Sequence, residues 1–223
     1  MKVYISDSEK LTKYNLPKEV QESYLIQYQP NGSKKVLDIS IESNENNWIL
    51  KSNGMVNVIE NNYTVQSATL SNYYTCELKM SIDNEKRYLY CLPDYNEKYT
   101  DFSIYNMANI VIGNGYNCNI NFPSPLLSDN HIVIQNNNNN YLLTTSYDNV
   151  YVNGLAVKQT FLKCGDIIFV AGLKIIFMQT FVRINNPNNQ LAINGMQYYT
   201  NASYGSYKDY EKIDTSEFSI DLY

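Results

Sequence analysis

The chain has 223 residues, 44% of them hydrophobic, so it is long enough to form one large domain or two small ones. Its formal net charge is -5, and it therefore lacks the basic surplus that binding to a nucleic-acid backbone requires. The only histidine is His131 and the only arginines are Arg87 and Arg183, so we expect no metal site, no cofactor and no enzymatic activity.

The N-terminus, MKVYISDSEK, lacks the apolar segment of a secretory signal, and no apolar stretch of about 18 residues occurs anywhere. The expectation is that the chain as given is soluble and cytoplasmic.

Short apolar stretches rich in Ile, Val, Tyr and Phe recur along the chain, and Asn and Gly separate them. This pattern is typical of an all-β sandwich, and the helical period is absent. The strands predicted in the first half are Lys2–Ser6, Tyr24–Tyr28, Leu37–Ile41, Asn47–Leu50, Met55–Ile59, Ala68–Ile82 with an internal bend, and Arg87–Cys91.

A second series of strands begins near Phe102. The polar segment Pro93–Thr100 predicts a domain boundary before it, and Asn136–Asn140 predicts a hairpin loop within it. Its other predicted strands are Ile110–Ile112, Asn119–Phe122, His131–Gln135, Tyr141–Thr145, Val150–Val152, Ile167–Val170 and Lys174–Thr180.

After Arg183 the strand pattern gives way to a polar sequence rich in Tyr and Asn. We interpret it as a linker, or as an arm that packs on a partner or on the second sandwich. The predicted organisation is a sandwich over residues 1–94, a second sandwich over residues 95–185, and a tail over residues 186–223.

Four motifs follow one another in the second half. They are Ile110–Gly113 followed by Asn119-Ile120, Leu127-Ser128 with His131, Val150–Val152 with Asn153-Gly154, and Leu162 with Gly165-Asp166 and Ile167-Ile168. The ordered set resembles the forkhead-associated (FHA) family from Ile110 to Phe177. The resemblance implies a β-sandwich whose loops bind phosphothreonine peptides.

Several of these residues also have a structural explanation. We expect Gly113 and Gly115 to adopt a positive φ at a sharp strand end, and Asn153-Gly154 to form a type I′ hairpin. Gly165-Asp166 predicts the turn before the last core strands.

The resemblance implies an architectural role for His131, which would tie down the serine loop with hydrogen bonds. The alternative is a general base in a triad with Ser128 and Asp129. Because these three residues lie close together just before one strand, we regard triad geometry as improbable.

In the FHA family, phosphothreonine is held by an arginine after the first glycine, the serine, a second basic residue, and the asparagine of the Asn-Gly pair. Here the two basic positions are Asn114 and Asp129, whereas Ser128 and Asn153 remain. A phosphate dianion binds best to guanidinium groups, so the sequence predicts that these loops do not require phosphate. Charge from a neighbouring loop, supplied by Lys158 or Lys163, is the alternative.

The first half has a similar number of predicted strands but no Ser-x-x-His motif, so it is predicted to be a degenerate copy. Such a tandem resembles the N-terminal cytoplasmic region of the membrane-bound FtsK/SpoIIIE-type ATPases of Gram-positive type VII secretion. This resemblance implies that membrane-spanning and ATP-binding modules follow in a longer protein, and that the partners are proteins of the secretion machinery. The phosphate-loop motif GxxxxGK[ST] is absent from the sequence.

Three functions are therefore weighed. The first is a non-catalytic interaction module that is independent of phosphorylation. The second is a phosphothreonine reader that uses Ser128, Asn153 and Lys158. The third, a carbohydrate-active enzyme, would need paired carboxylates in a cleft, whereas Asp and Glu are scattered over predicted turns.

Overall fold

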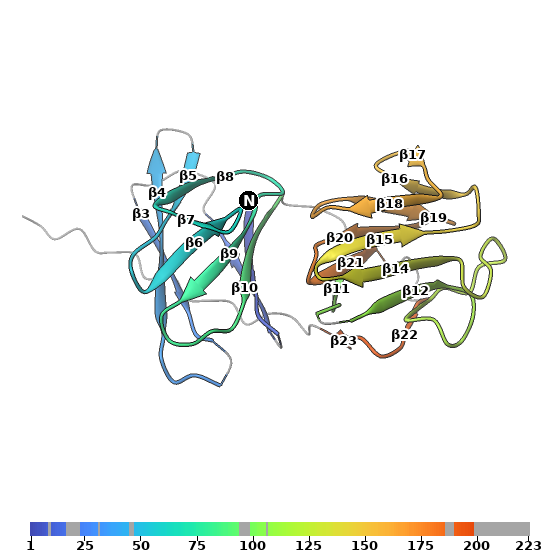
Figure 1. Ribbon diagram of the computed structural model, residues 1–223, viewed down its shortest axis with the longest axis horizontal. Helices are drawn as coiled ribbons and strands as arrows, with labels where there is room; N and C mark the ends of the chain where they lie inside the picture. Colours follow the sequence, from blue (N-terminus) through green and yellow to red (C-terminus); the bar gives the residue numbers. More distant parts are fainter. Residues whose placement is uncertain are drawn as a thin grey trace, which may run out of the picture.

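The structure, a computed structural model, describes residues 1–8, 10–16, 23–30, 32–44, 47–93, 99–105, 107–185 and 190–198. All the regular elements in these ranges are β-strands, arranged in four sheets, which confirms the predicted all-β fold (Figure 1). No helix capable of crossing a membrane is present in the described ranges.

The first sandwich consists of sheet A and sheet B. Sheet A has the strand order β2-β1-β10-β9-β6-β7, and sheet B the order β3-β4-β5-β8. Their bounds are β1 Lys2–Ser6, β2 Leu11–Asn15, β3 Ser23–Tyr28, β4 Leu37–Asn44, β5 Asn47–Lys51, β6 Val56–Glu60, β7 Tyr63–Val65, β8 Ser67–Leu70, β9 Thr75–Met80 and β10 Arg87–Leu92.

The second sandwich consists of sheet C and sheet D. Sheet C has the order β17-β16-β19-β20-β21-β11-β23, and sheet D the order β18-β15-β14-β12-β13-β22. Their bounds are β11 Tyr99–Ser103, β12 Asn109–Gly113, β13 Ile120–Asn121, β14 Ile132–Asn137, β15 Asn140–Thr144, β16 Val150–Val152, β17 Leu155–Ala156, β18 Gln159–Leu162, β19 Ile167–Val170, β20 Leu173–Phe177, β21 Phe181–Asn185, β22 Ala192–Ile193 and β23 Gln197–Tyr198.

Two predicted strands include a turn: Lys174–Thr180 runs past the end of β20 and β21 was not predicted, whereas Ala68–Ile82 contains its expected bend. The turn at residues 178–180 separates β20 from β21, and its Gln179 has a φ of 67°. The expected bend within Ala68–Ile82 separates β8 from β9. The Asn hairpin is shorter than predicted, because β14 and β15 extend into it and leave Asn138 and Asn139 at φ of 53° and 66° as the turn.

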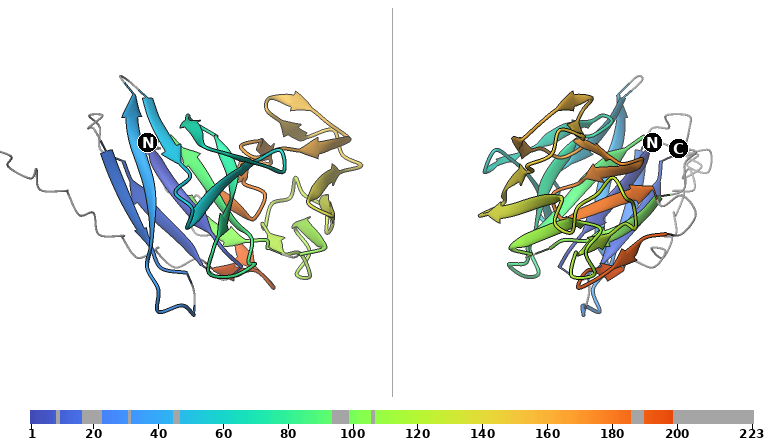
Figure 2. Two further views of the ribbon diagram at one scale, coloured as in Figure 1. Left: turned by 60° about the vertical axis from the view of Figure 1, so that its left-hand side comes forward. Right: turned by 90° about the vertical axis from the view of Figure 1, so that its right-hand side faces the viewer.

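The two sandwiches stack as four layers in the order B, A, C, D, and the views in Figure 2 show the succession. One apolar core lies between sheets B and A, and another lies between sheets C and D. A third cluster joins the outer faces of sheets A and C, and we call it the seam. Its buried members are Tyr4, Leu11, Tyr90, Leu92, Ile176, Met178 and Phe181.

Polar contacts fix the seam. The hydroxyl groups of Tyr90 and Thr180 lie 2.8 Å apart, and Thr180 donates to Ser6 Oγ at 3.1 Å. Arg183 forms an ion pair with Asp101 at 2.7 Å, and its guanidinium lies 5.0 Å from the centre of the Tyr4 ring. Burial raises the pKa of the Asp101 carboxyl, although Arg183 opposes the shift. The seam therefore joins the two sandwiches through apolar packing and buried hydrogen bonds.

Residues 190–198, which we predicted as part of the tail, add two short strands to the second sandwich. β22 pairs with β13, and β23 pairs with β11. The Asn194 side chain donates to the carbonyl groups of Tyr116 and Cys118 at 3.0 and 2.9 Å. The rest of the predicted tail, residues 186–189 and 199–223, lies outside the described residues, as do residues 94–98 of the predicted boundary.

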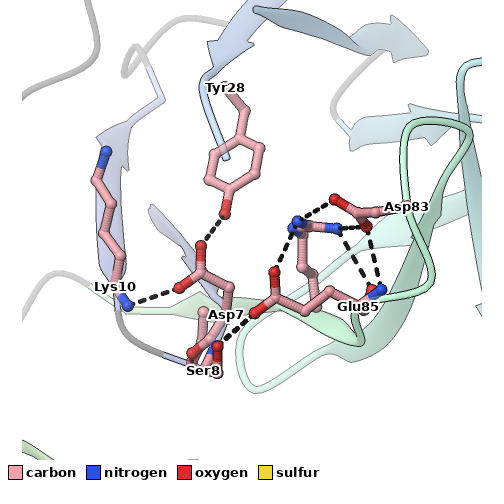
Figure 3. Close-up of polar contacts among 8 residues, drawn as sticks. Asp7, Ser8, Lys10, Tyr28, Asp83 and Glu85 are labelled. Atoms are coloured by element: carbon pink, nitrogen blue, oxygen red, sulfur yellow. Dashed lines mark hydrogen bonds and ion pairs between the residues drawn. The ribbon is translucent and has the colours of Figure 1, made fainter. Parts of the chain in front are cut away.

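A cluster of charged and polar side chains at one end of the first sandwich surrounds Arg87, whose side chain is fully buried (Figure 3). Its guanidinium donates to both carboxylate oxygens of Asp83, at 2.6 and 2.8 Å, and to Glu85 at 2.9 Å. Nearby, Tyr28 donates to the buried carboxylate of Asp7 at 2.7 Å. The charge of Arg87 is thus compensated by two carboxylates inside the fold, and Asp7 is held by a neutral hydroxyl.

The Asp83–Arg87 pair makes stability depend on pH. The hydrogen bonds from Arg87 lower the pKa of Asp83. A carboxyl with a depressed folded-state pKa stabilises the fold above its unfolded pKa of about 3.9, and that contribution is lost as the pH falls through the folded value. We expect Asp83→Asn to reduce the free energy of unfolding at pH 7 and to match the parent near pH 2, as measured by urea unfolding across this range. Asp148→Asn, a control at an exposed ion pair, should change little. If Asp83→Asn lowered the free energy of unfolding equally at both pH values, the Asp83–Arg87 pair would not be the source of the pH dependence.

Candidate functional site

The candidate site lies at the loops between β12 and β14, at the end of the second sandwich away from the first (Figure 1). Two backbone bonds hold these loops together: the Asn114 N–H donates to the Ser128 carbonyl at 2.9 Å, and the Gly115 N–H donates to the Asp129 carbonyl at 3.1 Å. The Cys118 thiol also donates to the Asp129 carbonyl. The chain is therefore folded back on itself, with the Asn114 and Asp129 residues exposed.

Gly113 lies under this crossing, and the reason we expected for it is wrong. Neither Gly113 nor Gly115 has a positive φ. A Cβ on Gly113 would instead lie 2.3 Å from the Asp129 carbonyl oxygen and 2.6 Å from that of Ser128. The position therefore requires glycine because two backbone segments approach each other closely.

His131 is buried and occupies the centre of the serine loop. Its Nδ1 accepts a hydrogen bond from the Ser128 backbone N–H at 3.1 Å, so the ring proton is on Nε2, which lies 2.7 Å from Asn149 Oδ1. Tyr147 stacks on the ring, with the centroids 4.1 Å apart. Because both ring nitrogens are occupied by structural contacts, His131 is not available as a general base for Ser128.

Asn153 does not join this loop. Its side-chain amide donates to Asp166 at 2.8 Å and its Oδ1 accepts from the Ile167 N–H at 2.9 Å, so the side chain closes the turn before β19. Asn153 and Gly154 have φ of 51° and 82°, as a type I′ hairpin requires. β16 separates Asn153 from Asn149, the residue that contacts His131, by about 13 Å of extended chain.

Asp166 and Gly165 form the turn before β19. The second carboxylate oxygen of Asp166 accepts from the Lys163 N–H at 2.7 Å. A Cβ on Gly165, whose φ is 89°, would lie 2.9 Å from the Tyr73 ring of the first sandwich. This turn is therefore part of the contact between the two sandwiches.

Sequence reasoning missed Asn149, whose amide donates to the Leu126 carbonyl at 3.1 Å while its oxygen contacts His131. The available signal was its position directly before a predicted strand, within the polar segment that starts at Ser146. The Asn153-Gly154 hairpin motif is the stronger sequence pattern, so Asn153 was predicted as the asparagine of the site instead of Asn149.

Of the two lysines that could supply charge to the site, Lys158 is already paired, and Lys163 contacts Asp166 through its backbone N–H. The Lys158 ammonium donates to the Ser146 carbonyl at 2.8 Å and forms an ion pair with Asp148 at 2.7 Å. Both arginines of the chain are buried in internal ion pairs, Arg87 in the first sandwich and Arg183 at the seam. At the two positions where FHA domains carry basic residues, the exposed side chains are an amide, Asn114, and a carboxylate, Asp129.

Ser128, Asp129 and His131 do not form a catalytic triad. The Ser128 hydroxyl lacks an activating base, because the only histidine is committed to the loop. Elsewhere in the chain, the carboxylates of Asp83, Glu85 and Asp101 form ion pairs with the two arginines. No group of histidine, cysteine and acidic side chains suitable for a metal ion occurs within the described ranges.

Residues 110–170 match the family model of the FHA domain. This family consists of protein-interaction modules, and the matched segment contains Gly113, Ser128, His131, Asn153 and Gly165 in the predicted order. No curated protein matches the chain.

The solved structures that are similar to this chain include three FHA domains. The N-terminal FHA domain of EssC, a component of the bacterial type VII secretion apparatus, is 9% identical with a TM-score of 0.41, covering 90% of this chain and 98% of that one. The FhaA FHA domain, solved with the intracellular domain of Rv3910, is 20% identical (TM-score 0.30; 39% and 98% covered). The FHA-2 domain of the Mycobacterium tuberculosis ABC transporter Rv1747 is 19% identical (TM-score 0.32; 44% and 89% covered).

Proposed function

From the similarity of residues 110–170 to FHA domains, we propose that this chain is a non-catalytic protein–protein interaction module that does not require phosphorylation of its partner. The loops around Ser128 present Asn114 and Asp129 to that partner. The same loops expose the side chains of Tyr116 and Leu126, at 84% and 65%, which suits a docking surface of mixed apolar and polar character.

The observation that carries this proposal is the placement of the two arginines. A phosphate dianion draws most of its affinity from bidentate guanidinium contacts. Arg87 and Arg183 are buried and engaged with Asp83 and Asp101, and Lys158 is paired with Asp148. A phosphate near Ser128 would instead meet the Asp129 carboxylate, which repels it.

The proposed context is the cytoplasmic N-terminal region of an EssC-like type VII secretion ATPase. The partners would be proteins of that secretion machinery, and ATP-binding and membrane-spanning parts would belong to the longer protein. In this proposal residues 1–94 and 95–185 are the two FHA-like sandwiches, and residues 190–198 extend the second. The chain itself would use no cofactor.

The test is a fluorescence titration of the chain with a threonine peptide from a candidate partner and with its phosphothreonine form. We expect the two dissociation constants to agree within about twofold, because no free guanidinium faces Ser128. Phosphopeptide binding at least tenfold tighter, lost in Ser128→Ala and retained in the control Ser146→Ala, would replace the proposal with a phosphothreonine reader.

One observation favours the reader as the second candidate. Ser128 is partly exposed, and its backbone N–H, not its hydroxyl, forms the bond to His131. In this role the Ser128 hydroxyl would donate a hydrogen bond to the phosphate. Asn153 and Lys158 would have to leave their present partners to contact the phosphate as well.

A further inference from the structure

A hollow of about 560 Å³ opens beside the seam, between the outer face of sheet A and the 178–180 turn of the second sandwich. A smaller hollow of about 80 Å³ adjoins it, because Tyr88 and Gln179 line both. We call the pair the seam groove. It is separate from the loops around Ser128, and both sandwiches are needed to form it.

The floor of the seam groove is a row of side chains across sheet A. Ile59 is paired with Glu77, and Glu77 is paired with Tyr88, so the three stand next to one another on adjacent strands. Burial and the neighbouring Glu77 raise the pKa of Tyr88 to about 12, so its hydroxyl stays protonated and can donate a hydrogen bond. Tyr105, from the second sandwich, completes the aromatic part of the lining.

Two carboxylates contribute to the larger hollow. Glu60 is oriented by Tyr74, whose hydroxyl donates to it at 2.6 Å. Glu77 is half-buried, and no hydrogen bond or ion pair to its carboxylate is found within the residues that the structure describes. A half-buried carboxylate beside an aromatic ring, with no cation of its own, is an incomplete arrangement that a positively charged group would complete.

The opposite wall is held in a conformation that costs free energy. Gln179 has a φ of 67°, and a left-handed backbone is unfavourable at a residue other than glycine. The neighbouring Thr180 anchors the turn through its bonds to Tyr90 and Ser6. The seam thus fixes the backbone of the turn, and Gln179 lines the groove, where its amide adds a neutral hydrogen-bonding group.

We propose that the seam groove binds an arginine side chain presented by an extended segment of a partner protein. The guanidinium would stack on Tyr88 and donate to Glu77, with Glu60 close by and Gln179 accepting a further hydrogen bond. Lys86 lines only the smaller hollow, where its positive charge would repel a guanidinium. The guanidinium is therefore expected in the larger hollow. The chain's net charge of -5 also favours a basic partner. This inference rests on the proposed role in protein docking and names the chemistry of one contact.

The test is a titration of the full 223-residue chain, followed by two-dimensional amide NMR, with the peptide acetyl-Gly-Ser-Arg-Ser-Gly-amide. The matched probe has citrulline, which is neutral and nearly the same shape, in place of arginine. We expect the arginine peptide to shift the amide signals of Glu77, Tyr88 and Gln179, and the citrulline peptide to bind at least about fivefold more weakly. Glu77→Gln should weaken the arginine peptide by a similar factor.

The control variant is Glu42→Gln, which removes a carboxylate from sheet B and should bind like the parent. Equal binding of the two peptides, parent-like affinity in Glu77→Gln, or shifts confined to other surfaces would each overturn the proposal. Phosphate-dependent binding at Ser128 would contradict the proposed function but would not change the binding of the arginine peptide at the seam groove. Failure of the proposed function can therefore be distinguished from failure of the arginine site.

Discussion

Replacing Arg87 with methionine is expected to lower the free energy of unfolding by about 3 kcal/mol in urea unfolding at pH 7. Methionine preserves much of the buried volume, but it removes the guanidinium that holds Asp83 and Glu85. These two carboxylates are 37% and 30% exposed, so water can partly replace the lost bonds. This rehydration places the expected loss at the lower end of the range for breaking a buried ion pair.

The matched control for this variant is Lys51→Met, which breaks the ion pair with Glu42 in the same sandwich. That pair spans 3.3 Å and both side chains are at least 37% exposed, so its loss should cost less than about 1 kcal/mol. If the two variants lose equal stability, burial of Arg87 does not increase the contribution of its ion pairs to the free energy of unfolding.

Gly113→Ala is expected to cost at least about 2 kcal/mol, because the added methyl group meets backbone and not a movable side chain. The Ser128–Asp129 segment must shift away, and the bonds from the Asn114 N–H to Ser128 and from the His131 N–H to Ile112 weaken with it. Urea unfolding measures the loss, and faster amide hydrogen exchange at Asn114 and His131 localises it.

Gly154→Asn provides the comparison. A Cβ at Gly154 meets nothing within 4 Å, and its φ of 82° lies in the region that asparagine tolerates best after glycine. We expect a cost below about 1 kcal/mol there, with no change in exchange at His131. Similar losses of unfolding free energy in Gly113→Ala and Gly154→Asn would mean that both positions need glycine for its conformational freedom. Close approach of the backbone would then not explain Gly113.

The all-β fold and the order of motifs in the second sandwich could be predicted because they depend on local patterns. Alternating apolar residues and Asn-Gly turns mark strands wherever one face is buried. β2 and β18, Leu11–Asn15 and Gln159–Leu162, were missed because each is short and mixes polar with apolar residues. The predicted strand Lys174–Thr180 ran three residues too far because Met178 and Thr180 in the turn are themselves buried at the seam, and β21 was not predicted.

The site was less predictable because its contacts join residues that are distant in sequence. The pairing of Arg183 with Asp101 spans 82 positions and follows from the antiparallel pairing of β11 and β21. The role of Gly113 depends on a carbonyl group 16 positions away, which no local pattern reveals. The four-residue spacing of Asp83 and Arg87, by contrast, was visible in the sequence, although only burial makes that pair important.

The seam has a consequence for the order in which the protein is made. The first sandwich is complete once Leu92 has left the ribosome, yet Ile176 and Phe181, which cover Tyr4 and Tyr90, are synthesised much later. At typical rates of translation, the roughly ninety residues in between take on the order of ten seconds. During that interval a newly folded domain presents an aromatic sheet face to solvent, and a chaperone or a neighbouring nascent chain can reach it before its own partner sandwich exists.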